Sequence, residues 1–153
     1  MKPLIILFAL IVSTSYGQHS YLSYKACAKY SVLFNAGLIQ GSHEANYSHY
    51  ATFARVHGIT NPAYFDPAIS WKMKWAEGST TKERFLGSST VFAPFTDYYH
   101  FSKAMYISMM SVGFTINLSA KQKLKDVLVE SLIGMAAQKA GFLVSYNCIY
   151  STN

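Results

Sequence analysis

The chain has 153 residues, the size of one domain with a modest core. Charged residues make up 13% of it, against about 25% in ordinary soluble domains, and apolar residues make up 51%. This balance argues against a freely soluble globule and favours contact with a membrane or a partner surface. The formal net charge of +6 is dispersed, without lysine- or arginine-rich runs, so we expect no nucleic-acid partner.

The first 17 residues have the organisation of a secretory signal peptide. Lys2 supplies a positive charge, an apolar run extends from Leu4 to Val12, and Ser15 and Gly17 are the small residues that signal peptidase requires. The apolar run is shorter than the roughly 20 residues that cross a bilayer. We therefore expect cleavage after Gly17, export, and one helical domain over residues 18–153. An uncleaved membrane anchor is the alternative.

The two cysteines, Cys27 and Cys148, lie near opposite ends of the exported chain. Export permits disulfides, and the two side chains would meet if the first and last helices run antiparallel. Cysteine is also a common small buried residue. The sequence leaves a disulfide and two buried thiols open.

A first helix is predicted from Tyr21 to about Gln40, because this segment lacks proline and is rich in alanine, leucine and aromatic residues. Lys25 and Lys29 lie one turn apart, on what we expect to be its wetter side. Gly37 and Gly41 form a pair that permits close approach of another helix. Whether Gly41 instead breaks the helix stays open.

A continuation is predicted from a cap at Ser42 to about Val56, with Gly58 as the stop signal. Asn61-Pro62 and Asp66-Pro67 then mark a connection rich in turns, because proline moves the preceding residue out of helical geometry.

Ser70–Trp75 reads Ser-Trp-Lys-Met-Lys-Trp. In a helix, Trp71 and Trp75 would share one face with Lys72 and Lys74 beside them, which is typical of a short amphipathic helix lying in a membrane interface. The alternative is that the two tryptophans cover the end of a helical core.

The second half predicts two long apolar helices. Gly87–Thr90 supplies small residues and candidate caps, and a helix should begin near Pro94 and include the uncharged run Ala104–Leu118. Ser119–Gln122 has the form of a capping box and should open a last helix that ends at about Tyr150. The expected fold is all-α: a small bundle of three or four hydrophobic helices, with the short Trp/Lys helix and a loop-rich middle.

Several motifs occur in an order that resembles a family of small bacterial envelope proteins with hydrophobic helices. They are Asn61-Pro62-Ala63-Tyr64-Phe65-Asp66-Pro67, Ser70-Trp71-Lys72-Met73-Lys74-Trp75, Gly87-Ser88-Ser89-Thr90 and Thr96-Asp97-Tyr98-Tyr99-His100. The similarity covers roughly residues 37–114. It implies a helical, membrane-associated protein of the cell envelope and no established activity.

A fainter similarity is to YfiM-type predicted envelope lipoproteins, which have an Asp-Lys-x-x-His-Phe helix and a later acidic helix. In this chain Asp97 lies three residues before His100 rather than four, and Tyr98 replaces the lysine. The lipid-bearing cysteine of those proteins is also absent.

Four polar residues within the apolar helices are the candidate site. Asp97 and His100, three residues apart, should share one helix face at the start of the apolar run. If three helices pack together, Glu44 and Glu130 would join them in a buried polar cluster, since a buried acid is costly without a partner. Carboxylates and imidazole suit Zn, Mn or Fe, so the four are also the candidate metal ligands.

Two functions follow from these observations. The first is an exported, membrane-associated helical envelope protein with a binding or structural role, whose partner is the bilayer or another envelope protein. The second is a small metal-dependent hydrolase or transferase at the membrane surface, using Glu44, Asp97, His100 and Glu130. The sequence identifies no cofactor, and it carries no catalytic signature such as a nucleophile elbow or a phosphate loop.

Overall fold

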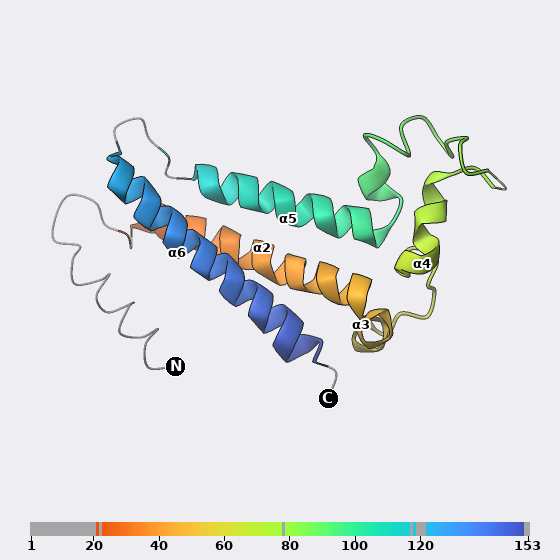
Figure 1. Ribbon diagram of the computed structural model, residues 1–153, viewed down its shortest axis with the longest axis horizontal. Coiled ribbons are helices and arrows are strands. Elements are labelled where there is room, and N and C mark those ends of the chain that lie inside the picture. Colours follow the sequence, from red (N-terminus) through yellow and green to blue (C-terminus); the bar gives the residue numbers. More distant parts are fainter. Residues whose placement is uncertain (1–20, 22, 78, 117, 119–121, 152–153) are drawn as a thin grey trace.

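The computed structural model describes Tyr21, residues 23–77 and 79–116, Leu118, and residues 122–151. The expected all-α bundle is confirmed, and the described residues contain no strand beyond one isolated bridge. Three long helices form the bundle: α2 (Tyr24–Ser48), α5 (Tyr98–Thr115) and α6 (Leu124–Leu143). Helix α2 packs against both α5 and α6, which touch each other little (Figure 1). The predicted signal segment lies outside the described residues.

Helices α2 and α6 run parallel. Lys29 near the start of α2 contacts Glu130 near the start of α6, and Gly41 faces Ser145 further along both. Cys27 and Cys148 therefore lie at opposite ends of the bundle, no disulfide joins them, and both are exposed. Of the two alternatives that the sequence left open, the disulfide required antiparallel helices and is excluded by the parallel direction, and two buried thiols are also wrong because both side chains are exposed.

Glycines let α2 and α6 approach closely. A Cβ added to Gly41 would lie 2.7 Å from the Cβ of Ser145, and one added to Gly37 would collide with the carbonyl oxygen of Gln138. On α6, Gly141 lies in the same way against the backbone of Phe34. Helix α2 therefore continues through Gly41, and the Gly-x-x-x-Gly pair admits a neighbouring helix.

The connection between α2 and α5 starts with α3 (Tyr50–His57). Helix α3 stops at Gly58, as expected, because this residue adopts the left-handed conformation with φ 61°. Ser42 is not a cap, since it lies inside α2. The Asp66 side chain caps α4 (Pro67–Ser70) by accepting a hydrogen bond from the Ala68 N–H.

The Trp/Lys segment is not an amphipathic α-helix. It forms the four-residue 3-10 turn η1 (Trp71–Lys74), and Trp75 already has an extended backbone with φ −104° and ψ 150°. Contacts with the next loop explain this ending: Trp75 forms an antiparallel bridge with Glu83, and the Ser88 hydroxyl donates to the carbonyl of Lys74 at 2.6 Å.

Glu83 holds the loop that follows. Its carboxylate accepts hydrogen bonds from the N–H of Gly87 at 2.8 Å, from the N–H of Ser89 at 3.1 Å, and from the Ser89 hydroxyl. These bonds, the Ser89 hydroxyl first, lower the pKa of Glu83 from its ordinary value. The Gly87–Thr90 motif thus binds a carboxylate in its own loop.

The two last helices begin later than the sequence predicts. Pro94 lies in the short 3-10 turn η2 (Ala93–Phe95), and α5 begins only at Tyr98. Helix α6 begins at Leu124 rather than at the capping box, of which Ser119 lies outside the described residues. After α6, a π-helical turn, η3 (Val144–Ile149), completes the chain's last helix near the expected position.

Candidate functional site

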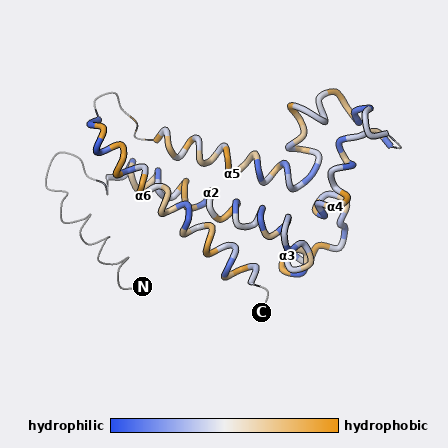
Figure 2. The backbone as a smooth tube through the Cα atoms, in the orientation of Figure 1, coloured by the Kyte–Doolittle hydropathy of each residue, from blue (hydrophilic) through white to orange (hydrophobic). Residues whose placement is uncertain are grey.

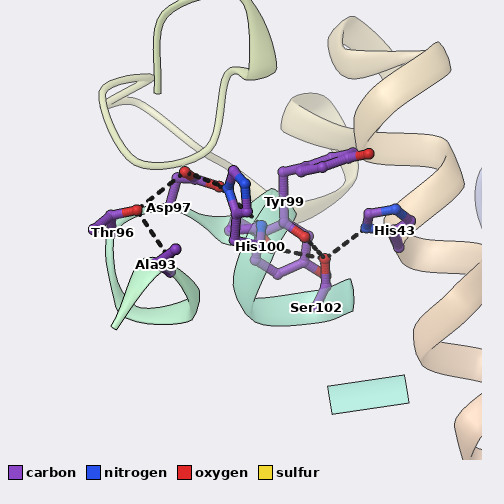
Figure 3. A network of polar contacts seen from close by, with 8 residues as sticks. His43, Ala93, Thr96, Asp97, Tyr99, His100 and Ser102 are labelled. Atoms are coloured by element: carbon purple, nitrogen blue, oxygen red, sulfur yellow. Dashed lines mark hydrogen bonds and ion pairs between the residues drawn. The ribbon is translucent and has the colours of Figure 1, made fainter. Parts of the chain in front are cut away.

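Asp97 is the N-cap of α5 rather than a residue on its face. Its Oδ1 accepts a hydrogen bond from the His100 N–H at 2.9 Å, and its carboxylate also lies 2.8 Å from the His100 Nδ1 (Figure 3). The Thr96 hydroxyl reaches Asp97 Oδ2 at 3.3 Å. The pair predicted from the sequence therefore exists. Asp97 is 1% exposed, whereas the His100 side chain is 32% exposed.

A cavity of about 230 Å³ adjoins this pair. Three separate segments form it: the end of α2, the α4–η1 turn and the start of α5. Its lining residues are Tyr47, Pro67, Ser70, Trp71, Asp97, Tyr99 and His100. The Tyr47 and Tyr99 rings contact each other at 5.5 Å, so three aromatic side chains and one imidazole surround the space.

A second polar contact fixes α5 against α2. His43 Nδ1 lies 2.9 Å from the Ser102 hydroxyl, which itself donates to the carbonyl of Tyr98 at 2.7 Å (Figure 3). Because the hydroxyl proton is used in that bond, His43 Nδ1–H is the donor to Ser102. The His43 ring also packs on Tyr99 at 4.6 Å, so this contact orients one wall of the cavity.

Glu130 lies elsewhere, in a buried ion pair with Lys29. The Lys29 Nζ and Glu130 Oε2 are 3.1 Å apart, and the two side chains are 3% and 1% exposed. Gln122 donates to the other carboxylate oxygen at 3.2 Å. The expectation of a wetter side for Lys29 is wrong, because α6 covers that face of α2.

Glu44 lines a different cavity, of about 400 Å³, between α2 and α6. Its other lining residues are Gln40, Gln138, Lys139, Phe142 and Tyr146. The four residues expected to converge therefore occupy three places: Asp97 with His100, Glu130 with Lys29, and Glu44 in this groove. Within the parts of the chain that the structure describes, no three His, Cys, Asp or Glu residues are grouped to hold a metal ion. The four residues do not converge because the parallel packing of α2 and α6 places Glu130 beside Lys29.

A hydroxyl network that the sequence did not predict joins α2, α3 and α5 near the start of α5. The Ser42 hydroxyl lies 2.7 Å from the Tyr98 hydroxyl and 3.0 Å from that of Tyr150, and His57 Nε2 lies 2.6 Å from the latter. Burial raises the pKa of Tyr150 above its ordinary value. The spacing of these residues carries no signal, because they come from segments far apart in the sequence.

The four residues predicted at a membrane interface lie together at the surface of the α4–η1 turn. Lys72 Nζ lies 5.9 Å from the Trp71 ring centroid, and Lys74 Nζ lies 5.6 Å from that of Trp75. The Trp71 indole N–H donates to the carbonyl of Ala68 at 3.1 Å. Each tryptophan thus has a lysine ammonium over its ring, and Trp71 also forms a wall of the smaller cavity.

Comparison with models of protein families, with curated proteins and with solved structures finds no match. The two family resemblances described above therefore stay expectations.

Proposed function

We propose that this chain is a membrane-associated helical protein of the cell envelope that acts by binding rather than by catalysis. The apolar outer surfaces of α5 and α6 contact the acyl chains in this proposal. The end of the bundle that carries Trp71 and Trp75 lies at the headgroups.

The arrangement of residues on α6 carries the proposal. Its buried residues are Asp126, Glu130, Gly134 and Gly141, none of which has a large apolar side chain. Its exposed large apolar residues are Leu124, Leu128, Leu132, Met135 and Leu143, and Lys125 and Lys139 are the exposed charged residues of the same helix. A helix on the surface of a water-soluble domain has the reverse arrangement. Small and polar residues at the helix interface, with apolar residues outside, are typical of helices in lipid.

Length and composition agree with this location. Among the described residues one stretch, Leu124–Ile149, is long and apolar enough to cross a membrane. Its 26 residues correspond to about 39 Å of helix, more than the roughly 30 Å of a bilayer's hydrocarbon core. The core helix of a soluble protein can be equally long and apolar, but most of this stretch is not buried in the protein. Its apolar residues recur along the whole helix (Figure 2).

Helix α5 adds to the apolar surface. It has no charged residue after Lys103, and Met105, Ile107 and Val112 are exposed along it. Its buried residues, Ser102 and Gly113, are small. Two of the three long helices thus direct large apolar side chains away from the protein.

The connection before α5 supplies interface residues. Five large apolar side chains are exposed in the loop between η1 and α5: Phe85, Leu86, Val91, Phe92 and Phe95. Lys72, Lys74, Lys82 and Arg84 lie in or beside the same segment. Aromatic rings and basic side chains together favour the headgroup region of an anionic membrane.

Export by residues 1–17 belongs to this proposal and places the protein in the envelope. The alternative, a metal-dependent enzyme, has no support from the described residues, where no three His, Cys, Asp or Glu side chains are grouped to hold a metal ion.

Fractionation of cells that produce the full chain tests the proposal. We expect the chain to sediment with membranes, to resist extraction by high salt and alkaline carbonate, and to dissolve in mild detergent. Recovery as a freely soluble monomer that needs no detergent would contradict it.

A further inference from the structure

His100 lines the cavity beside Asp97, and one of its two ring nitrogens is engaged by the protein. His100 Nδ1 is held by the Asp97 carboxylate, and Nε2 has no hydrogen-bond partner among the described residues. The His100 side chain as a whole is 32% exposed. Nε2 donates a hydrogen bond to an anion when the ring is protonated and accepts one when the ring is neutral.

Two lysines lie near the rings that line this cavity, although neither is itself a lining residue. Lys72 Nζ lies 5.9 Å from the centroid of the Trp71 ring, and Lys103 Nζ lies 5.8 Å from that of Tyr99. Both lysines are exposed, and both rings line the cavity. A cationic ligand would meet ring faces that already carry an ammonium group, so the aromatic walls do not form a cage for ammonium ligands.

The acid in the lining does not cancel this charge at the cavity mouth. Asp97 is the only carboxylate among the lining residues, it is 1% exposed, and its oxygens face the N–H and Nδ1 of His100. Of the charged or titratable side chains at the cavity, His100 is a partly exposed lining residue, and Lys72 and Lys103 are exposed beside lining rings. The site suits a small anion attached to a partly apolar body that packs on the rings.

We propose that this cavity binds the phosphate of an anionic phospholipid headgroup, with His100, Lys72 and Lys103 as the groups that recognise it. Its volume of about 230 Å³ is below the roughly 300–1,000 Å³ of pockets for drug-sized ligands, which suits a phosphate and its glycerol. The choice of a lipid as the source rests on the proposed membrane association. The phosphate site itself does not, since a soluble phosphate ester has the same chemistry.

Binding measurements on the full chain in detergent micelles test the site. The probes are glycerol 3-phosphate and, in a second arm, nanodiscs of phosphatidylglycerol or phosphatidylcholine, with tryptophan fluorescence as the readout. The variants are His100→Gln and the double variant Lys72→Gln/Lys103→Gln. The matched control is Lys125→Gln, which removes an exposed lysine at the opposite end of the bundle.

We expect saturable binding of glycerol 3-phosphate and a preference for phosphatidylglycerol over phosphatidylcholine. Loss of one surface lysine near an anionic layer costs about 1 kcal/mol, about a fivefold loss of affinity, so the double variant should weaken binding by at least tenfold. His100→Gln should weaken it as well, and Lys125→Gln should not. Circular dichroism should report the same helix content for all variants.

The outcomes separate the two proposals. If both variants bind as wild type does, the site is wrong. The site is also wrong if the protein neither prefers the anionic lipid nor binds glycerol 3-phosphate. Either result would overturn the site even if the chain stays in the bilayer. Saturable binding of glycerol 3-phosphate by a chain that enters neither nanodisc would overturn the lipid as the source and the membrane proposal with it.

Discussion

Lys29 on α2 and Glu130 on α6 form an ion pair 3.1 Å long between two side chains that are almost completely buried. Removing one partner of such a pair typically costs about 3–5 kcal/mol, because the other charge stays buried without it. We therefore expect Lys29→Met to lower the free energy of unfolding by about 3–5 kcal/mol. The double variant Lys29→Met/Glu130→Leu should lose clearly less than the sum of the single changes. Chemical unfolding in mixed micelles measures both.

The matched control for that experiment is Lys25→Met, because Lys25 is exposed one turn earlier on the same helix. A surface change of this kind should stay within about 0.5 kcal/mol. Equal losses for the two lysines would show that the ion pair does not hold α2 to α6.

The second prediction concerns the cap of α5. Asp97→Ala removes the acceptor for the His100 N–H and should destabilise the protein by about 1–2 kcal/mol, the usual loss for an N-cap. Asp97→Asn keeps a good cap and should retain most of the stability. His100→Ala should cost less than Asp97→Ala, because the imidazole is partly exposed. Thermal unfolding of the three variants would contradict this if Asp97→Asn and Asp97→Ala melted alike.

The third prediction concerns the close contact of α2 and α6. Gly37→Ala places a Cβ against the backbone carbonyl of Gln138, so the helices must separate. Overpacking of this kind costs about 1–3 kcal/mol. Ser31→Ala, at an exposed position of the same helix, is the control and should be neutral. A Gly37→Ala variant as stable as wild type would mean that α6 does not pack on this glycine.

The fourth prediction is a pH dependence in the loop after η1. Hydrogen bonds to Ser89 and Gly87 lower the pKa of Glu83 in the folded protein from its ordinary value of 4.5. Stabilisation from a depressed carboxyl pKa is fully present above the unfolded pKa and is lost as the pH falls through the folded pKa. Acidification below about pH 4 should therefore release the loop, since an unperturbed glutamate titrates near that value.

Limited proteolysis with pepsin under acidic conditions can follow this release. Cleavage near Phe85 and Leu86 should rise as the pH falls, and Glu83→Gln should be cleaved already at the higher end of the range. Glu77→Gln, which changes an exposed acid in the same connection, should behave like wild type. If the cleavage rate changes with pH only as the activity of pepsin itself does, Glu83 does not hold the loop.

Local features of the fold could be predicted from the sequence. The segment without proline before Gln40 is helical, and Gly58 ends α3 because its positive φ suits glycine. The pairing of Asp97 with His100 was also correct, since residues three apart at a helix start meet through local geometry alone.

The direction of the helices could not be predicted, because it depends on how the long connection returns the chain. That direction decides which residues meet: it places Glu130 on Lys29 and leaves Glu44 in a separate groove. The length of the Trp/Lys helix was wrong for a similar reason. Contacts from Ser88 and Glu83, which come later in the chain, end it at Lys74.

Flotation of purified chain with phosphatidylcholine vesicles tests the membrane proposal most directly. Wild type should rise with the vesicles, and Leu128→Lys/Leu132→Lys should remain at the bottom, because each lysine costs about 2.5–3.5 kcal/mol in the middle of a membrane helix. Thr80→Lys/Thr81→Lys adds the same charge at exposed loop positions and should float like wild type. If Leu128→Lys/Leu132→Lys floats as well as wild type, or if wild type itself stays at the bottom as a soluble monomer, the apolar surface of α6 does not face a bilayer.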